Sequence, residues 1–195
     1  MAINRLNVSL SGVQPGGLAK VVPTSVAVGS GSGSVDSNGT VTFSGASSVS
    51  LNGCFSSTYD NYKIVASIKG STNLFVNFRY RTTSDDSSAN YYWQRQGYTA
   101  GGATTNGNGA AQTSGSITPT TTEEYGDFDL TLYNPFLSKL TIFSGTSYGL
   151  AQDYSNNANY HVGSIMNTTT SYTGLTLISS TGTITGTVRI YGYTN

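Results

Sequence analysis

The side chains in this sequence that could perform acid–base or metal chemistry are few and widely spaced. There is one imidazole, His161, which lies between Tyr160 and Val162 in a segment with strand-like alternation. A catalytic triad or a zinc site needs several such groups at defined spacing, and no Cys or His pattern supplies them. We therefore assign His161 a structural or surface role and expect no catalytic residue, metal site or cofactor.

The carboxylates include one pair whose spacing could matter. Asp127 and Asp129 lie two residues apart, so a strand would place both on one face. A glycosidase needs two carboxyl groups across a cleft, but Phe128 and its apolar neighbours point to the opposite, buried face. We interpret the pair as part of a solvated face, with polysaccharide hydrolysis as the weaker alternative. The other acidic pairs are interpreted as loop charges: Asp85-Asp86 and Glu123-Glu124.

Two further motifs have simple structural interpretations. Asp36-Ser37-Asn38-Gly39 is similar to the opening of a calcium loop, but no Glu follows at the closing position, so it predicts a turn. Cys54 is the single cysteine and cannot form an intrachain disulfide. We expect it to pack as a small apolar residue in a protein that folds in a reducing cytoplasm.

Composition excludes several classes of function. The formal net charge is zero and only 9% of the residues are charged, so there is no basic stripe to bind nucleic acid. No window approaches the ~18 apolar residues of a membrane span, so we expect no membrane insertion. Gly, Ser, Thr and Asn make up about half of the chain, but the aromatic content of 11% argues against disorder.

Alternation of apolar and polar residues predicts antiparallel strands with one wet face. It is clearest over residues 74–81, and similar runs follow as far as residues 183–190. Roughly eight to ten short strands with Gly, Asn and Ser connections predict an all-β domain over residues 40–195. We expect an antiparallel β-sandwich or a jelly-roll-like fold, with a long polar loop over residues 99–116.

Residues 1–39 differ from the rest of the chain. They contain no aromatic residue and include the Gly/Ser run 29–34, which is typical of a flexible linker. We interpret the segment as an extended N-terminal arm that becomes ordered against a partner, as an added strand. Its apolar residues are the candidate partner-binding groups: Leu18, Val21, Val22, Val26 and Val28.

The sequence Tyr91-Tyr92-Trp93, with Arg95 close by, is the densest aromatic cluster. Aromatic and Arg side chains dominate interface hot spots, but large aromatics also fill cores. Alternation places Tyr92 opposite Tyr91 and Trp93, so at least one of them belongs to the core. Core packing, a subunit interface and ligand contact remain open, and Tyr91, Trp93 and Arg95 are the candidate contacts.

Three stretches resemble a β-domain common in virion proteins of tailed bacteriophages. They are residues 47–65, which include Tyr59-Asp60-Asn61-Tyr62, then Asp129-Leu130-Thr131-Leu132-Tyr133-Asn134-Pro135, and Gly186-Thr187-Val188-Arg189-Ile190-Tyr191-Gly192. The resemblance covers about residues 40–193. It implies a non-enzymatic structural protein of the virion, assembled in the host cytoplasm, without catalytic residues.

The absence of a repetitive shaft helps to choose within this family. An arm and one domain suit a capsid decoration or cement protein, with the arm lying along the shell. Such proteins often form closed rings, so the expected partners are copies of the chain in a homotrimer and the major capsid protein or other virion proteins. The alternative is a tail-fibre or tail-tip receptor-binding protein, whose loop 99–116 and aromatics near Trp93 contact a host surface glycan.

Overall fold

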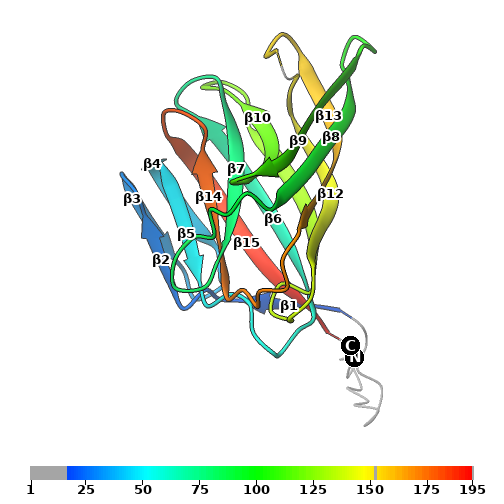
Figure 1. The fold of residues 1–195 in the computed structure, drawn as a ribbon. Coiled ribbons are helices and arrows are strands. Elements are labelled where there is room, and N and C mark those ends of the chain that lie inside the picture. Colours follow the sequence, from blue (N-terminus) through cyan, green and yellow to red (C-terminus); the bar gives the residue numbers. More distant parts are fainter. Residues whose placement is uncertain (1–16, 152, 195) are drawn as a thin grey trace, which may run out of the picture.

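The computed structural model describes residues 17–151 and 153–194, and these form two antiparallel β-sheets packed face to face (Figure 1). The described residues contain fifteen strands and no helix, which confirms the predicted β-sandwich. Accordingly, none of the described elements is a helix that could cross a membrane.

The larger sheet, sheet A, has ten strands, and the smaller, sheet B, has five. In spatial order, sheet A contains β3 (Ser32–Val35), β4 (Val41–Ala46), β15 (Ile184–Thr194), β6 (Asn61–Gly70), β11 (Gly126–Tyr133), β12 (Thr141–Leu150), β13 (Asn157–Met166), β8 (Tyr91–Thr99) and β9 (Thr104–Gln112), with β1 (Gly17–Val21) paired to β15. Sheet B contains β10 (Gly115–Thr120), β7 (Leu74–Arg81), β14 (Gly174–Ser179), β5 (Ser48–Asn52) and β2 (Ser25–Val28).

The period-two pattern decides which side of each strand is buried. In β7, buried and half-buried side chains alternate over all eight residues, as the sequence predicts. In β11, Phe128, Leu130 and Leu132 face sheet B, while Asp127 and Asp129 face outward. Sheet A therefore has one face in the core and one outer face.

Aromatic rings fill the centre of the sandwich. Phe78 lies 4.8 Å from Phe143 and 5.3 Å from Tyr80, measured between ring centroids, so it joins the two sheets. Tyr91, a predicted partner contact, is fully buried beside this cluster, and its hydroxyl donates to the backbone oxygen of Asp86. The structure therefore resolves Tyr91 as a core residue, because its register on β8 points it at sheet B.

The structure differs from the expected arm in the part of residues 1–39 that it describes. Strands β1, β2 and β3 pair with β15, β5 and β4, so residues 17–35 contribute strands to the chain's own two sheets. The Gly/Ser run 29–34 makes the crossing from β2 in sheet B to β3 in sheet A. Gly31 takes a φ of 69° at this crossing, which explains why glycine is used there. Residues 1–16 lie outside the described residues.

The prediction of a loop over residues 99–116 is wrong for most of that range. Residues 104–112 form β9, an edge strand that pairs with β8 although it is rich in Gly and Asn. The pairing sets Asn108 beside Gln94 and Asn106 beside Gln96, so amide side chains face one another on the outer face. The Gly- and Asn-rich composition predicted a loop, because composition carries no information about backbone hydrogen bonds to a neighbouring strand.

Candidate functional site

Arg95 is the most unusual side chain of the sandwich. It points inward from β8 and is 2% exposed, although it carries a charge. Its Nη1 donates a 3.1 Å hydrogen bond to the hydroxyl of Ser116, while its Nε is buried and has no hydrogen-bond partner among the described residues. Burial lowers the pKa of Arg95 to about 10, so the guanidinium stays protonated at neutral pH.

Aromatic rings surround this guanidinium. Its central carbon lies 4.7 Å from the ring centroid of Phe75, 5.0 Å from that of Trp93 and 5.9 Å from that of Tyr160. Ring faces attract cations, and the attraction is stronger where water is excluded. The three rings thus stabilise a charge that no carboxylate in the described residues neutralises by an ion pair.

A cavity of about 230 Å³ opens beside Arg95, where the inner face of β8 meets β10 and the outward-facing side chains of β7. Its walls combine the rings of Phe75 and Trp93 with the side chains of Asn77, Gln112, Ser114 and Ser116. Trp93 packs closely over Gly109 of β9, where a Cβ atom would lie 2.5 Å from the indole nitrogen. The glycine-rich β9 therefore makes room for the indole. Sequence reasoning identified Trp93 and Arg95, but not Phe75 or the polar lining.

The outer face of sheet A carries an apolar row across four strands. The register sets Tyr133 beside Ile142, Ile142 beside Ile165, and Ile165 beside Tyr92. Tyr133 exposes 40% of its surface, Ile165 exposes 42% and Tyr92 exposes 40%. We call these four residues the outer apolar row.

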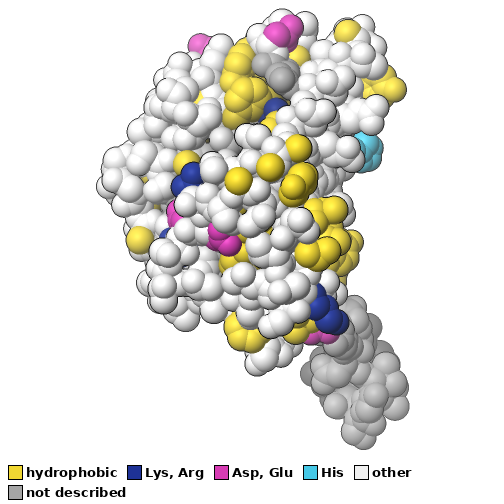
Figure 2. Space-filling view, viewed as in Figure 1, with side chains coloured by type: hydrophobic (Ala, Val, Ile, Leu, Met, Phe, Trp, Pro, Cys, Tyr) yellow, Lys and Arg dark blue, Asp and Glu magenta, His cyan; other side chains and the backbone are white. Residues whose placement is uncertain are grey.

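A groove of about 470 Å³ lies beside Tyr92, Ile142 and Ile165 of this row and is also lined by Ser144 and Gly163. Figure 2 shows apolar side chains gathered at the right-hand edge of the molecule, over the lower parts of β12 and β13. Sequence alternation placed Tyr92 on the face opposite Tyr91 and Trp93, but it assigned no outward face to the other three members of the row. It could not align them, because the row exists only through the register of four strands.

The candidate contacts of the N-terminal segment divide into two groups. Leu18 and Val22 are exposed and remain available to a partner. Val21, Val26 and Val28 are half-buried and pack against the core of the chain itself. The apolar character of this segment is thus largely explained by its own sandwich.

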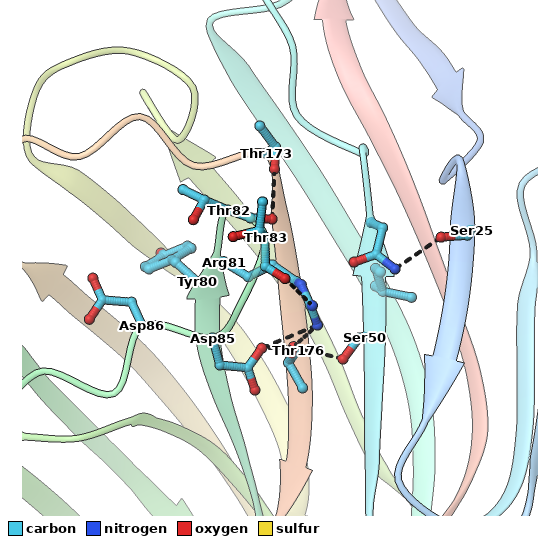
Figure 3. A network of polar contacts seen from close by, with 12 residues as sticks. Ser25, Ser50, Tyr80, Arg81, Thr82, Thr83, Asp85, Asp86, Thr173 and Thr176 are labelled. Atoms are coloured by element: carbon cyan, nitrogen blue, oxygen red, sulfur yellow. Dashed lines mark hydrogen bonds and ion pairs between the residues drawn. The ribbon is translucent and has the colours of Figure 1, made fainter.

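A second arginine, Arg81, lies in a network of polar contacts on the outer side of sheet B (Figure 3). Its Nη1 lies 3.2 Å from a carboxylate oxygen of Asp85 and donates to Thr176, which in turn donates to Asp85. Asp86 accepts a hydrogen bond from Tyr172. The Asp85-Asp86 pair is therefore in a loop, as predicted, but its carboxylates fasten that loop to β14 and to the segment before it.

The remaining candidates for chemistry have structural environments. His161 is exposed on the outer face of β13, and Asp129 forms a 2.8 Å ion pair with Lys63. Cys54 is buried, which confirms its predicted packing. Asp36 accepts hydrogen bonds from the backbone of Asn38 and Thr40, which confirms the turn.

Within residues 17–151 and 153–194, no group of three or more His, Cys, Asp or Glu side chains is placed to hold a metal ion. No protein-family model, curated protein or solved structure matches this chain.

Proposed function

We propose that this chain is a non-enzymatic structural protein of a tailed-bacteriophage virion and that copies of it associate through the outer apolar row. The observation that carries the proposal is the row itself, because it places four large apolar side chains side by side on a solvated face. Contiguous apolar surface of this kind marks interaction sites in soluble proteins.

Low charge supports the same interpretation. With 9% charged residues, the surface is dominated by hydroxyl and amide groups, and one ion pair, Lys63–Asp129, lies on the described outer face. Contacts made by such a surface depend little on salt, since there is little Coulomb attraction to screen. The resemblance over residues 40–193 supplies the virion context.

Within the virion, we assign the chain to the capsid as a decoration or cement protein that assembles as a homotrimer. Attachment to the major capsid protein involves the N-terminal segment, whose described part exposes Leu18 and Val22. A closed ring would bury the outer apolar row of each copy and leave the far edges of the sandwich in water.

Sedimentation velocity over a range of concentrations tests the self-association. Ile165→Lys, in the row, should shift the protein to monomer, because it buries an unpaired charge at the contact. His161→Lys adds a charge on the same face of the same strand but outside the row, and should leave the association unchanged. A native protein that stays monomeric at every concentration contradicts the proposal.

The location is tested on particles of the virus that encodes the chain. Gold-labelled antibodies against the purified protein should mark the capsid at regular intervals. Labelling restricted to the tail would instead support the second candidate function. Particles without label would contradict both.

The second candidate is a tail-fibre or tail-tip protein that binds a host surface glycan. The Arg95 cavity favours it, since a charged group, aromatic faces and amide side chains converge there. Fluorescent protein should then bind host cells, and Gln112→Ala, at the exposed wall of the cavity, should reduce that binding without loss of fold.

A further inference from the structure

The starting observation is a buried positive charge with no opposite charge beside it. The described residues form two ion pairs, Lys63–Asp129 and Arg81–Asp85, and Arg95 is in neither. Arg81, by comparison, has a carboxylate at 3.2 Å and two further acceptors, although its Nε likewise has no hydrogen-bond partner among the described residues. Burying a charge without such a partner is costly, so the exception points to a group supplied from outside.

The missing partner must accept hydrogen bonds. Among the described residues, Arg95 donates to one acceptor, the Ser116 hydroxyl, and its Nε has none. The rings of Phe75 and Trp93 attract the cation but cannot accept these hydrogen bonds in the plane of the guanidinium. A carboxylate does both, because its two oxygens match the planar fork of an arginine.

The cavity walls narrow the choice of carboxylate. Asn77, Gln112 and Ser114 bring amide and hydroxyl groups to the opening, and the ring of Trp93 forms an apolar wall. A sugar ring offers hydroxyl groups at its rim and C–H groups on its face, which suits this combination. The volume of about 230 Å³ is below the ~300–1,000 Å³ of most small-molecule sites, so one terminal residue would enter.

We propose that the cavity bounded by Phe75, Trp93 and Arg95 binds the carboxylate of an acidic saccharide, as a terminal uronic or sialic acid residue. The carboxylate accepts hydrogen bonds from Arg95, the sugar face packs on the indole, and the hydroxyl groups reach Asn77 and Gln112. The proposal deepens the second candidate function, the binding of a host surface glycan, and the biological role of the cavity rests on that function.

Trp93 provides the signal for the test, because it is the single tryptophan of the chain and its ring centroid lies 5.0 Å from the guanidinium. The full chain is titrated with glucuronate and with N-acetylneuraminate while tryptophan fluorescence is recorded. Methyl glucoside controls for the sugar ring, acetate for the charge, and a short Asp-containing peptide for a protein ligand. Because the titration uses isolated sugars, it tests binding in the cavity independently of whether the protein binds host cells.

The expected result is a saturable change with an acidic sugar, with binding at least about tenfold weaker for Arg95→Met, since a hydrogen-bonded charge pair is lost. Arg189→Met removes an exposed arginine of β15 and should bind as the native protein does. Gln112→Ala, at the exposed wall, should weaken binding and serves if Arg95→Met does not fold. Cooperative urea unfolding verifies each variant.

Three results would overturn the proposal. One is the absence of saturation with both acidic sugars, and another is equal binding of methyl glucoside. The third is tighter binding of the Asp peptide than of either sugar, which would assign the cavity to a carboxylate from a neighbouring protein.

Discussion

The hydroxyl of Tyr172 donates a 2.7 Å hydrogen bond to Oδ2 of Asp86, which ties the segment before β14 to the loop after β7. The other carboxylate oxygen accepts from the backbone and hydroxyl of Ser88. Burial alone would raise the pKa of Asp86, but the bonds from Ser88 and Tyr172 outweigh it and hold that pKa below its ordinary value of 3.8. The ring of Tyr172 stacks on Tyr80 in the core, so this contact joins the core to the loop.

Tyr172→Phe should lower the free energy of unfolding by about 1–2 kcal/mol at pH 7, because it removes a hydrogen bond to a charged group and keeps the ring. A carboxylate with a lowered pKa stabilises the fold fully above its unfolded pKa and loses that effect as the pH falls through the folded pKa. The difference between native and variant protein should therefore shrink below pH 3.8.

Urea unfolding followed by circular dichroism at neutral and acidic pH measures this difference. Tyr98→Phe, which removes an exposed hydroxyl from the outer face at a position outside the outer apolar row, is the matched control and should show no change at either pH. An equal destabilisation by Tyr172→Phe at both pH values would show that the charge of Asp86 is not involved.

Arg95 and Arg81 should respond in opposite ways to the same substitution. Arg95→Met removes a buried charge without an ionic partner among the described residues, and should raise the free energy of unfolding by about 1 kcal/mol. Arg81→Met leaves Asp85 and Thr176 without their shared donor, and should lower it by about 2 kcal/mol.

Thermal and urea unfolding of the two variants beside the native protein give the comparison. A loss of stability in Arg95→Met as large as that in Arg81→Met would mean that the aromatic rings fully compensate the buried charge. The cavity would then lack the energetic reason to take an anion.

The strands were predictable from the sequence where one face is buried. The alternation of Leu74, Val76, Phe78 and Tyr80 specified β7 and its inner face, because burial of every second side chain is a local pattern. Strand β9 was missed because its residues bury little, and its backbone pairing with β8 leaves no trace in hydrophobicity. The N-terminal strands were missed for the same reason.

The candidate site was predictable only in part. Trp93 and Arg95 lie two residues apart, so their shared side of a strand follows from the sequence. Phe75 comes from sheet B and Tyr160 from β13, and nothing local relates either of them to Arg95. The absence of a carboxylate beside the guanidinium likewise depends on which strands meet there.

Cys54 should be unreactive in the folded protein. Burial raises the pKa of its thiol to about 12, so almost no thiolate exists near neutral pH. A chromogenic disulfide reagent should therefore modify it only through unfolding, at a rate that rises steeply with urea. Ser44→Cys, at an exposed position of β4 away from the outer apolar row, is the accessible control and should react at once. Fast modification of native Cys54 without urea would show that the core around it opens locally.

The close approach of β8 to β13 gives a final prediction that depends on glycine. A Cβ atom at Gly97 would lie 1.8 Å from the backbone oxygen of Asn159, whereas one at Gly163, on β13, would have its nearest neighbour at 3.8 Å. Gly97→Ala must push the strands apart, and overpacking of this kind costs about 1–3 kcal/mol. Gly163→Ala fits without movement and should change the unfolding free energy little, as measured by urea unfolding.

Because Gly97 lies two residues beyond Arg95 on the same strand, Gly97→Ala should also weaken the fluorescence response to acidic sugars. Equal stability of the two variants would contradict the register between β8 and β13, on which both the outer apolar row and the Arg95 cavity depend.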